Sequence, residues 1–178
     1  MKIIFLSDIH GIYNNLNIID RVIQDKKIDK VVVLGDLYYF GDNYSNSLIN
    51  NLEVKNFLIK YRDKLICMKG NCDSNLVVKL SEFPIHSDIS KINVDDLVIY
   101  ITHGNQYSLK RGSKFAINGI LVYGHEHIPY IETREDMVYI NVGSISLPRK
   151  GLPTYMIYEN RKFIIYDING NIVDQIEL

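Results

Sequence analysis

The sequence predicts an α/β fold in which two β-sheets pack face to face and helices cover the outside. Two features of the 178-residue chain predict it: the first half alternates apolar runs with helical patterns, and after about residue 84 short strands joined by turns take over. No linker rich in Pro, Gly or Ser separates the two halves. We therefore expect a single domain over residues 1–178, with about 70% of the unfolded chain's surface buried.

The first half of the chain is predicted to be a βαβαβ unit. Its expected elements, in order, are a strand at 2–7, a helix at 14–25, a strand at 31–35, a helix at 47–61 and a strand at 65–70. Both helices carry an apolar stripe that would pack on a sheet, formed by Leu16, Ile19 and Ile23 in the first and by Val54, Phe57, Leu58 and Tyr61 in the second. Ser47 is a natural N-cap for the second helix.

The second half contains short apolar segments separated by turns. The expected strands lie at 91–94, 97–102, 120–124, 128–133, 137–141, 154–158, 162–168 and 172–178. The sequences Asp95-Asp96 and Asn169-Gly170-Asn171 predict tight turns between neighbouring strands. This half is therefore expected to be rich in β-structure.

Composition and charge narrow the classes of function. Lys+Arg number 20 and Asp+Glu 21, and the net charge of -1 excludes the strongly basic field that drives non-specific nucleic-acid binding. No apolar stretch approaches the ~18 residues that a membrane span needs, and the N-terminus lacks a secretory signal. The two cysteines, Cys67 and Cys72, are too few for a disulfide framework. We expect a cytoplasmic protein with a small substrate and no stable nucleic-acid or membrane partner.

Polar motifs follow five of the expected strands directly. They are Asp8-Ile9-His10, Gly35-Asp36, Gly70-Asn71-Cys72-Asp73, His103-Gly104 and Gly124-His125-Glu126-His127. Ligands bind at the carboxyl ends of strands in an open sheet, so these motifs are expected to meet at one rim. Of the five histidines, only His86 lies outside them.

The side chains in these motifs are suited to transition metals. Four His, two Asp and one Asn form a mixed nitrogen and oxygen set that favours divalent Mn, Fe, Co, Ni or Zn over Ca or Mg. Seven ligands are too many for one ion, but they suit two ions about 3.5–4 Å apart, bridged by a carboxylate. Alone, each motif has a plain structural interpretation, such as Asp8 capping a helix. Together and in order, the motifs favour a dinuclear site for displacement at phosphorus.

The ordered motifs resemble those of the calcineurin-like metallophosphoesterase superfamily, and specifically its small YfcE-type phosphodiesterases. The resemblance covers nearly the whole chain and implies a four-layer α/β sandwich of two mixed β-sheets flanked by helices. It also implies which residues hold each metal ion, with Asp36 as the bridge: Asp8, His10, Asp36 and His127 for one ion, and Asn71, His103 and His125 for the other. Manganese is our first choice of metal, with Fe, Ni, Co or Zn as alternatives.

The expected reaction is attack of a metal-bound hydroxide on a small phosphodiester. A neutral ligand such as Asn71 leaves residual positive charge on the site to attract the anion. Catalysis is expected to depend on Asp36, Asn71, Cys72 and His103, and contacts with substrate on Asn71, Cys72 and Asn105. Cys72 stands where many relatives have a His that assists the leaving group, and a thiol with a reference pKa of about 8.5 is not an obvious acid. A packing role for Cys72 is an equal alternative.

Other functions are compatible with this sequence. The aromatic segment 38–44 could stack on a nucleobase, or form a loop lip or a subunit contact in a homo-oligomer. A nuclease or a phosphomonoesterase of the same superfamily is the enzymatic alternative. A non-catalytic interaction module is the other, since a retromer subunit resembles this fold. It is disfavoured because all seven ligand positions carry ligating side chains.

Overall fold

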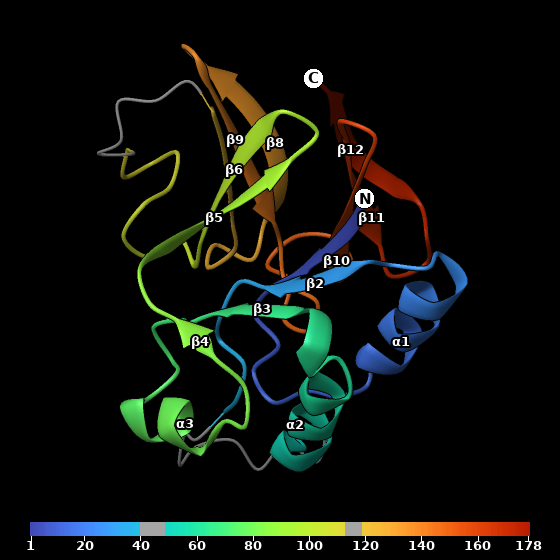
Figure 1. Cartoon of the computed structure of the whole chain (residues 1–178), viewed down its shortest axis with the longest axis vertical. Coiled ribbons are helices and arrows are strands. Elements are labelled where there is room, and N and C mark those ends of the chain that lie inside the picture. The colour runs from blue at the N-terminus through green and yellow to red at the C-terminus, as the bar shows by residue number, and fades with distance from the viewer. Residues whose placement is uncertain (40–48, 113–118) are drawn as a thin grey trace.

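The computed structural model describes residues 1–39, 49–112 and 119–178, and within them twelve strands form two sheets (Figure 1). Every strand predicted from the sequence is present, with bounds that shift by at most two residues. Three short elements were not predicted: the 3₁₀ helix η1 (Arg62–Lys64), the helix α3 (Asn75–Leu80) and the strand β4 (Ile85–His86). No helix in the described residues is long and apolar enough to cross a membrane.

The larger sheet has seven strands in the order β12-β11-β10-β1-β2-β3-β4. Its other strands are β1 (Lys2–Leu6), β2 (Lys30–Val33), β3 (Leu65–Met68), β10 (Thr154–Glu159), β11 (Lys162–Asp167) and β12 (Ile172–Glu177). Strands β1 to β4 are parallel, whereas β10 to β12 pair antiparallel. The sheet is therefore mixed, and the carboxyl ends of β1, β2 and β3 lie at the same edge.

The smaller sheet has five strands in the order β5-β6-β7-β9-β8. They are β5 (Ile89–Val94), β6 (Leu97–Thr102), β7 (Gly119–Tyr123), β8 (Pro129–Arg134) and β9 (Met137–Val142). Strands β6, β7 and β9 are parallel, and β5 and β8 pair antiparallel at the two edges. The expectation of two mixed sheets is confirmed.

Three apolar clusters pack these layers together, and β1 contributes to the two largest. Ile3 and Phe5 belong to the core between the sheets, whereas Ile4 and Leu6 face the helices, because successive residues of a strand point to opposite faces. All four side chains are fully buried. The strand that leads into the first polar motif is thus fixed on both faces.

The helices α1 (Leu16–Asp25) and α2 (Asn51–Lys60) cover the outer face of the larger sheet and lie side by side (Figure 1). A short 3₁₀ helix, η1 (Arg62–Lys64), links α2 to β3. The expected N-cap Ser47 lies outside the described residues, and Asn50 caps α2 by accepting a hydrogen bond from the Glu53 N–H at 3.1 Å. Asn is at least as good an N-cap as Ser, so the helix begins later than predicted.

The outer face of the smaller sheet packs against part of the segment that links β6 to β7. Tyr107 and Leu109 pack there against Tyr123 and other side chains of the sheet. In the parts of the chain that are described, this covering segment, residues 104–112, is irregular.

Candidate metal centre

The five polar motifs meet where the two sheets adjoin, as the strand ends predicted. Backbone hydrogen bonds tie their loops together: His10 N–H donates to the Asp36 carbonyl at 2.9 Å, and Gly124 N–H donates to the His103 carbonyl at 2.9 Å. The structure therefore brings all seven predicted ligands into one region. Their assignment as metal ligands stays a prediction.

One group contains Asp8, His10 and His127, whose potential ligand atoms all lie within 4.8 Å of one another. His127 Nε2 is 3.3 Å from Asp8 Oδ1 and also 3.3 Å from His10 Nε2. Asp8 is fully buried, and its Oδ1 accepts no hydrogen bond from the described residues. A buried carboxylate oxygen without such a partner is costly unless a cation binds it.

A second group contains Asp8, Asp36 and His103, again with ligand atoms within 4.8 Å. His103 Nε2 lies 2.9 Å from Asn71 Oδ1 and 3.4 Å from Asp36 Oδ2. The His125 ring packs edge-on against the His103 ring at a centroid distance of 5.0 Å. Asp36 Oδ2 also lies 3.7 Å from His10 Nε2, so one oxygen atom faces a histidine of each group.

Two of the histidines are oriented by backbone carbonyls. His103 Nδ1 donates to the Leu34 carbonyl at 2.8 Å, and His127 Nδ1 donates to the Leu147 carbonyl at 2.6 Å, since a carbonyl can only accept. In the neutral rings, this leaves an Nε2 lone pair aimed at a carboxylate. Lone pairs that converge in this way repel one another unless a cation lies between them. These nitrogen and oxygen atoms are therefore suited to act as ligands of divalent metal ions.

Most of the predicted ligands have a strained backbone. Five of the seven have left-handed φ angles: Asp8 (55°), His10 (48°), Asp36 (53°), His125 (64°) and His127 (57°). A non-glycine residue in this region costs about 1–3 kcal/mol when it is held in a strained conformation, and such residues cluster at functional sites. The surrounding structure must therefore hold these loops firmly.

Three polar residues that the sequence analysis left without a role hold these loops. The buried Asp73 carboxylate accepts the backbone N–H groups of Gly70, Asp36 and Leu37, each at 2.9 Å. Ser144 donates to the Asp8 carbonyl at 2.8 Å, and Asn141 donates to the Gly124 carbonyl at 2.7 Å. The position of Asp73 inside a polar motif was the signal that could have indicated its importance. Its role could not be predicted, because it depends on a contact with Asp36, which is 37 residues away in sequence.

Close packing in the loops requires glycine at two positions. A Cβ atom on Gly70 would lie 2.0 Å from Asp36 Oδ1, and one on Gly124 would lie 1.8 Å from Ser7 Oγ. Neither position has room for a side chain. The two glycines thus allow the loops to approach closely enough to bring the predicted ligands together.

The charges in the site shift the pKa values of its groups. Burial disfavours the ionised form of Asp36, but contacts with His103 and the Cys72 N–H outweigh it and hold the pKa of the carboxyl well below its usual range. Burial also opposes protonation of His103 and His127, yet their carboxylate neighbours raise the pKa of both rings above 6.5. Burial lowers the pKa of His10 and His125.

The remaining predicted site residues differ in placement. Cys72 is exposed, its Sγ lies within 4.8 Å of ligand atoms of His10 and Asp36, and Asn71 Nδ2 donates to it at 3.3 Å. Partial burial and the Asp36 carboxylate raise the pKa of this thiol to about 12. Asn105 is half-buried in the loop after β6, and its contact with substrate stays a prediction.

The aromatic segment gives little support to stacking. Tyr38 is buried in the core beside the helices and cannot stack on a ligand. Tyr39 is half-buried, and residues 40–44 lie outside the described part of the chain. Glu126, which lies between two predicted ligands in sequence, pairs with Lys110.

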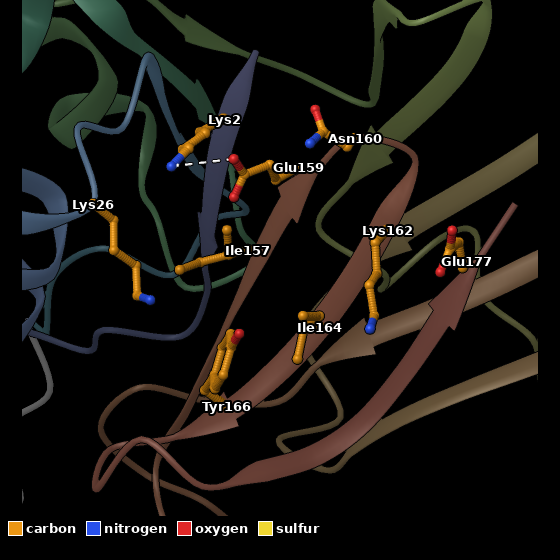
Figure 2. A pocket seen from close by; sticks show the side chains of 9 residues that line it. All are labelled: Lys2, Lys26, Ile157, Glu159, Asn160, Lys162, Ile164, Tyr166 and Glu177. Carbon is orange, nitrogen blue, oxygen red and sulfur yellow. Dashed lines mark ion pairs between the residues drawn. The ribbon is translucent and has the colours of Figure 1, made fainter.

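A hollow of about 310 Å³ lies away from the five loops, beside the amino end of β1 (Figure 2). It is lined by Lys2, Lys26, Ile157, Glu159, Asn160, Lys162, Ile164, Tyr166 and Glu177. None of these lining residues is a histidine or an aspartate, and Lys2 pairs with Glu159 at 3.1 Å. The predicted metal ligands are at the opposite end of the strand.

Residues 1–162 match the calcineurin-like phosphoesterase superfamily domain. The chain belongs to this superfamily. It is 30% identical to phosphodiesterase YfcE of Escherichia coli strain K12, over 100% of this chain and 98% of the relative. It is 27% identical to phosphodiesterase MJ0936 of Methanocaldococcus jannaschii, over 91% of this chain and 95% of the relative. The resemblance identified from the motifs is confirmed.

Solved structures agree with this assignment. A structure of YfcE from Escherichia coli, described as a phosphoesterase, has a TM-score of 0.90 and 28% identity, covering 99% of this chain and 98% of that one. The Entamoeba histolytica protein Vps29, solved with zinc, has a TM-score of 0.66 and 17% identity over 99% of this chain and 98% of that one, which shows a shared fold alone. Together with the grouped ligands, the family makes the chain a metal-dependent phosphoesterase.

Replacing Gly70 with Ala tests the close packing of the loops. A Cβ would meet Asp36 Oδ1 at 2.0 Å, so we expect Gly70→Ala to lose stability by about 1–3 kcal/mol and to bind Mn²⁺ more weakly. Gly119→Ala is the matched control, because its nearest neighbour would be at 3.4 Å. Denaturant unfolding and calorimetric metal titration measure both effects. Equal metal affinity in the two variants would contradict this account.

Metal affinity should rise with pH. His103 and His127 hold protons above their ordinary pKa of 6.5 and must lose them to bind metal, whereas His10 and His125 are already neutral there. We expect affinity to increase as the pH rises above 6.5, where these two rings lose their protons, with protons released on binding. Titration calorimetry in buffers of different ionisation enthalpy measures this release. A pH-independent affinity would rule out these two ligands.

Proposed function

We propose that this chain hydrolyses a small phosphodiester with two divalent transition-metal ions, of which manganese is the first choice. In this proposal Asp8, His10, Asp36 and His127 hold one ion, Asn71, His103 and His125 hold the other, and Asp36 bridges them. The position of Asp36 Oδ2, 3.7 Å from His10 Nε2 and 3.4 Å from His103 Nε2, is the observation that carries it. A carboxylate between two groups of nitrogen ligands suits a bridge.

When bound, two such ions polarise the phosphoryl oxygens and acidify a water molecule that serves as the nucleophile. The chain's own residues set the charge of the site. Only Asp8 and Asp36 contribute carboxylates, and Asn71 is neutral, so positive charge remains to attract an anionic diester. Asp73 adds no ligand, because its oxygens are occupied by backbone N–H groups.

The residues around the leaving group favour substrates that need no strong acid. Cys72 lies beside His10 and Asp36, but a thiol with a pKa of about 12 is a poor proton donor at neutral pH. Asn71 and Asn105 remain the proposed contacts to the phosphoryl oxygens. The enzyme is therefore proposed to act best on diesters with a stable leaving group.

The choice of a diester rests on the two named phosphodiesterases among the relatives, YfcE and MJ0936. A nuclease would need a basic groove, whereas the net charge is -1 and the nearby Lys110 is neutralised by Glu126 at 2.5 Å. A cytoplasmic location agrees with two cysteines that are both free, Cys67 in the core and Cys72 at the surface. Assembly into a homo-oligomer stays a prediction.

A substrate screen after metal removal tests the proposal. Chelated protein should be inactive on bis(p-nitrophenyl) phosphate and should recover with Mn²⁺, with lower activity on p-nitrophenyl phosphate and on DNA. Elemental analysis must accompany the assay, so that residual metal is known. Activity that survives metal removal would contradict metal dependence. Higher activity on the monoester would indicate a phosphomonoesterase, and higher activity on DNA would indicate a nuclease. Either result would contradict the proposed diesterase.

Cys72→Ser separates a catalytic role from packing. Because the aryl leaving group needs no proton, we expect this variant to keep most activity on bis(p-nitrophenyl) phosphate. Cys72→His should gain on poorer leaving groups, by less than the ~10²–10⁴-fold of a well-placed acid, since the pocket is not shaped for an imidazole. Steady-state rates at saturating Mn²⁺ measure both. Loss of turnover in Cys72→Ser with metal still bound would assign the thiol a direct role.

A further inference from the structure

Glu126 lies between the two predicted ligands His125 and His127, and its side chain joins a hydrogen-bonded ring outside the site. Its Oε2 accepts from Lys110 Nζ at 2.5 Å, and its Oε1 accepts from the Tyr130 hydroxyl at 3.4 Å. The side chain is only 11% exposed. A carboxylate that is largely shielded from water is costly to desolvate unless it is paired, so these partners matter.

The ring continues through a second tyrosine and returns to its start. The Tyr130 and Tyr123 hydroxyl oxygens are 2.5 Å apart, and the Leu109 backbone N–H donates to Tyr123 at 3.0 Å. Because Tyr130 donates to Glu126, Tyr123 must donate to Tyr130, and every donor then points towards the carboxylate. Leu109 and Lys110 are neighbours in sequence, so the ring closes. Hydrogen bonds aligned in one direction strengthen one another.

This ring connects two loops that carry predicted metal ligands. Leu109 and Lys110 belong to the covering segment, residues 104–112, which starts directly after His103. Glu126 belongs to the loop with His125, whose ring contacts that of His103. The ring therefore fixes the His103 loop and the His125 loop relative to each other.

The loop around Glu126 needs such support. His125 and His127 have φ angles of 64° and 57°, and the Glu126 N–H bonds back to the Gly124 carbonyl at 2.7 Å in a tight turn. Asp8 holds the His125 N–H on one side of the turn, at 2.9 Å. Asn141 and the Arg149 N–H hold the Gly124 and His127 carbonyls, and Glu126 adds the side-chain link from this turn to the covering segment.

We propose that Glu126 is a positioning residue for the metal centre: with Lys110, Tyr123 and Tyr130 it holds His125 and His127 in the conformation that binds metal. The inference rests on the proposed function only in taking these two histidines as ligands. Glu126 acts through the loop backbone and not through a hydrogen bond to a ligand ring, so its removal should weaken metal binding by less than the ~10–100-fold typical of a direct outer partner.

The test compares Mn²⁺ affinity of metal-free variants by titration calorimetry. Glu126→Ala should bind Mn²⁺ more weakly, by less than the ~10–100-fold that follows loss of a direct partner of a metal ligand, and Glu126→Gln should restore part of the loss because its carbonyl still accepts from Tyr130. Lys110→Met removes only the exposed partner and should show a smaller weakening. Glu132→Ala is the matched control, since Glu132 forms a pair with Arg134 at 3.1 Å on the surface of β8. The control should bind Mn²⁺ as the unmodified protein does.

Metal affinity separates positioning from a merely structural role. If Glu126 serves stability alone, the melting temperature of Glu126→Ala falls while Mn²⁺ affinity matches the control, and the inference is overturned. Should Glu126→Ala not fold, Lys110→Met decides: weaker Mn²⁺ binding supports the inference, and unchanged binding overturns it. Because calorimetry needs no substrate, a protein that binds Mn²⁺ but hydrolyses no diester would remove the proposed function and leave this test intact.

Discussion

Acceptor atoms converge on one another at the ends of five strands, and this convergence is the constraint on which the other features of the site depend. Asp36 Oδ2 faces Nε2 atoms of His10 and His103, and His127 Nε2 faces both Asp8 and His10. Such an arrangement is stable only when positive charge lies among the acceptors. Protons take that place in the metal-free protein, which is why the pKa values of His103 and His127 are raised.

The rest of the structure makes this convergence possible. The buried strand β1 fixes the point at which Asp8 begins, and Gly70 and Gly124 let neighbouring loops approach without a side chain between them. Left-handed backbone at five predicted ligands is held by Asp73, Asn141 and Ser144 from inside. On the outer side the Glu126 ring braces the same loops. The strain is thus supported by groups that bind no metal themselves.

The sequence was sufficient to predict the longer strands and the polar motifs that follow them, because both are visible in a few consecutive residues. Elements that depend on partners distant in sequence could not be predicted. The two-residue β4 is defined by its pairing with β3. The start of α2 is defined by the hydrogen bond from the Glu53 N–H to Asn50, one of several residues in this stretch that could cap a helix. Likewise, the segment 104–112 covers the smaller sheet because Tyr107 and Leu109 pack against apolar side chains that are distant in sequence.

The same limit applies to the candidate site. The ligand types and their order along the chain were visible, but the roles of Asp73 and Glu126 were not, because Asp73 accepts N–H groups from the Asp36 loop and Glu126 pairs with a lysine 16 residues away. Their positions inside two of the motifs marked both carboxylates, but residue spacing alone did not indicate their partners. Their function emerges only when the loops are folded against one another.

Anomalous diffraction from crystals grown with Mn²⁺ tests the central claim most directly, since it counts and locates the ions. The account predicts two peaks in the unmodified protein, one on each side of Asp36 Oδ2, and neither peak in Asp36→Ala, because the bridging carboxylate serves both ions. His103→Ala should lose chiefly one peak. A single peak in the unmodified protein, or two fully occupied ions in Asp36→Ala, would contradict the dinuclear site and its bridge.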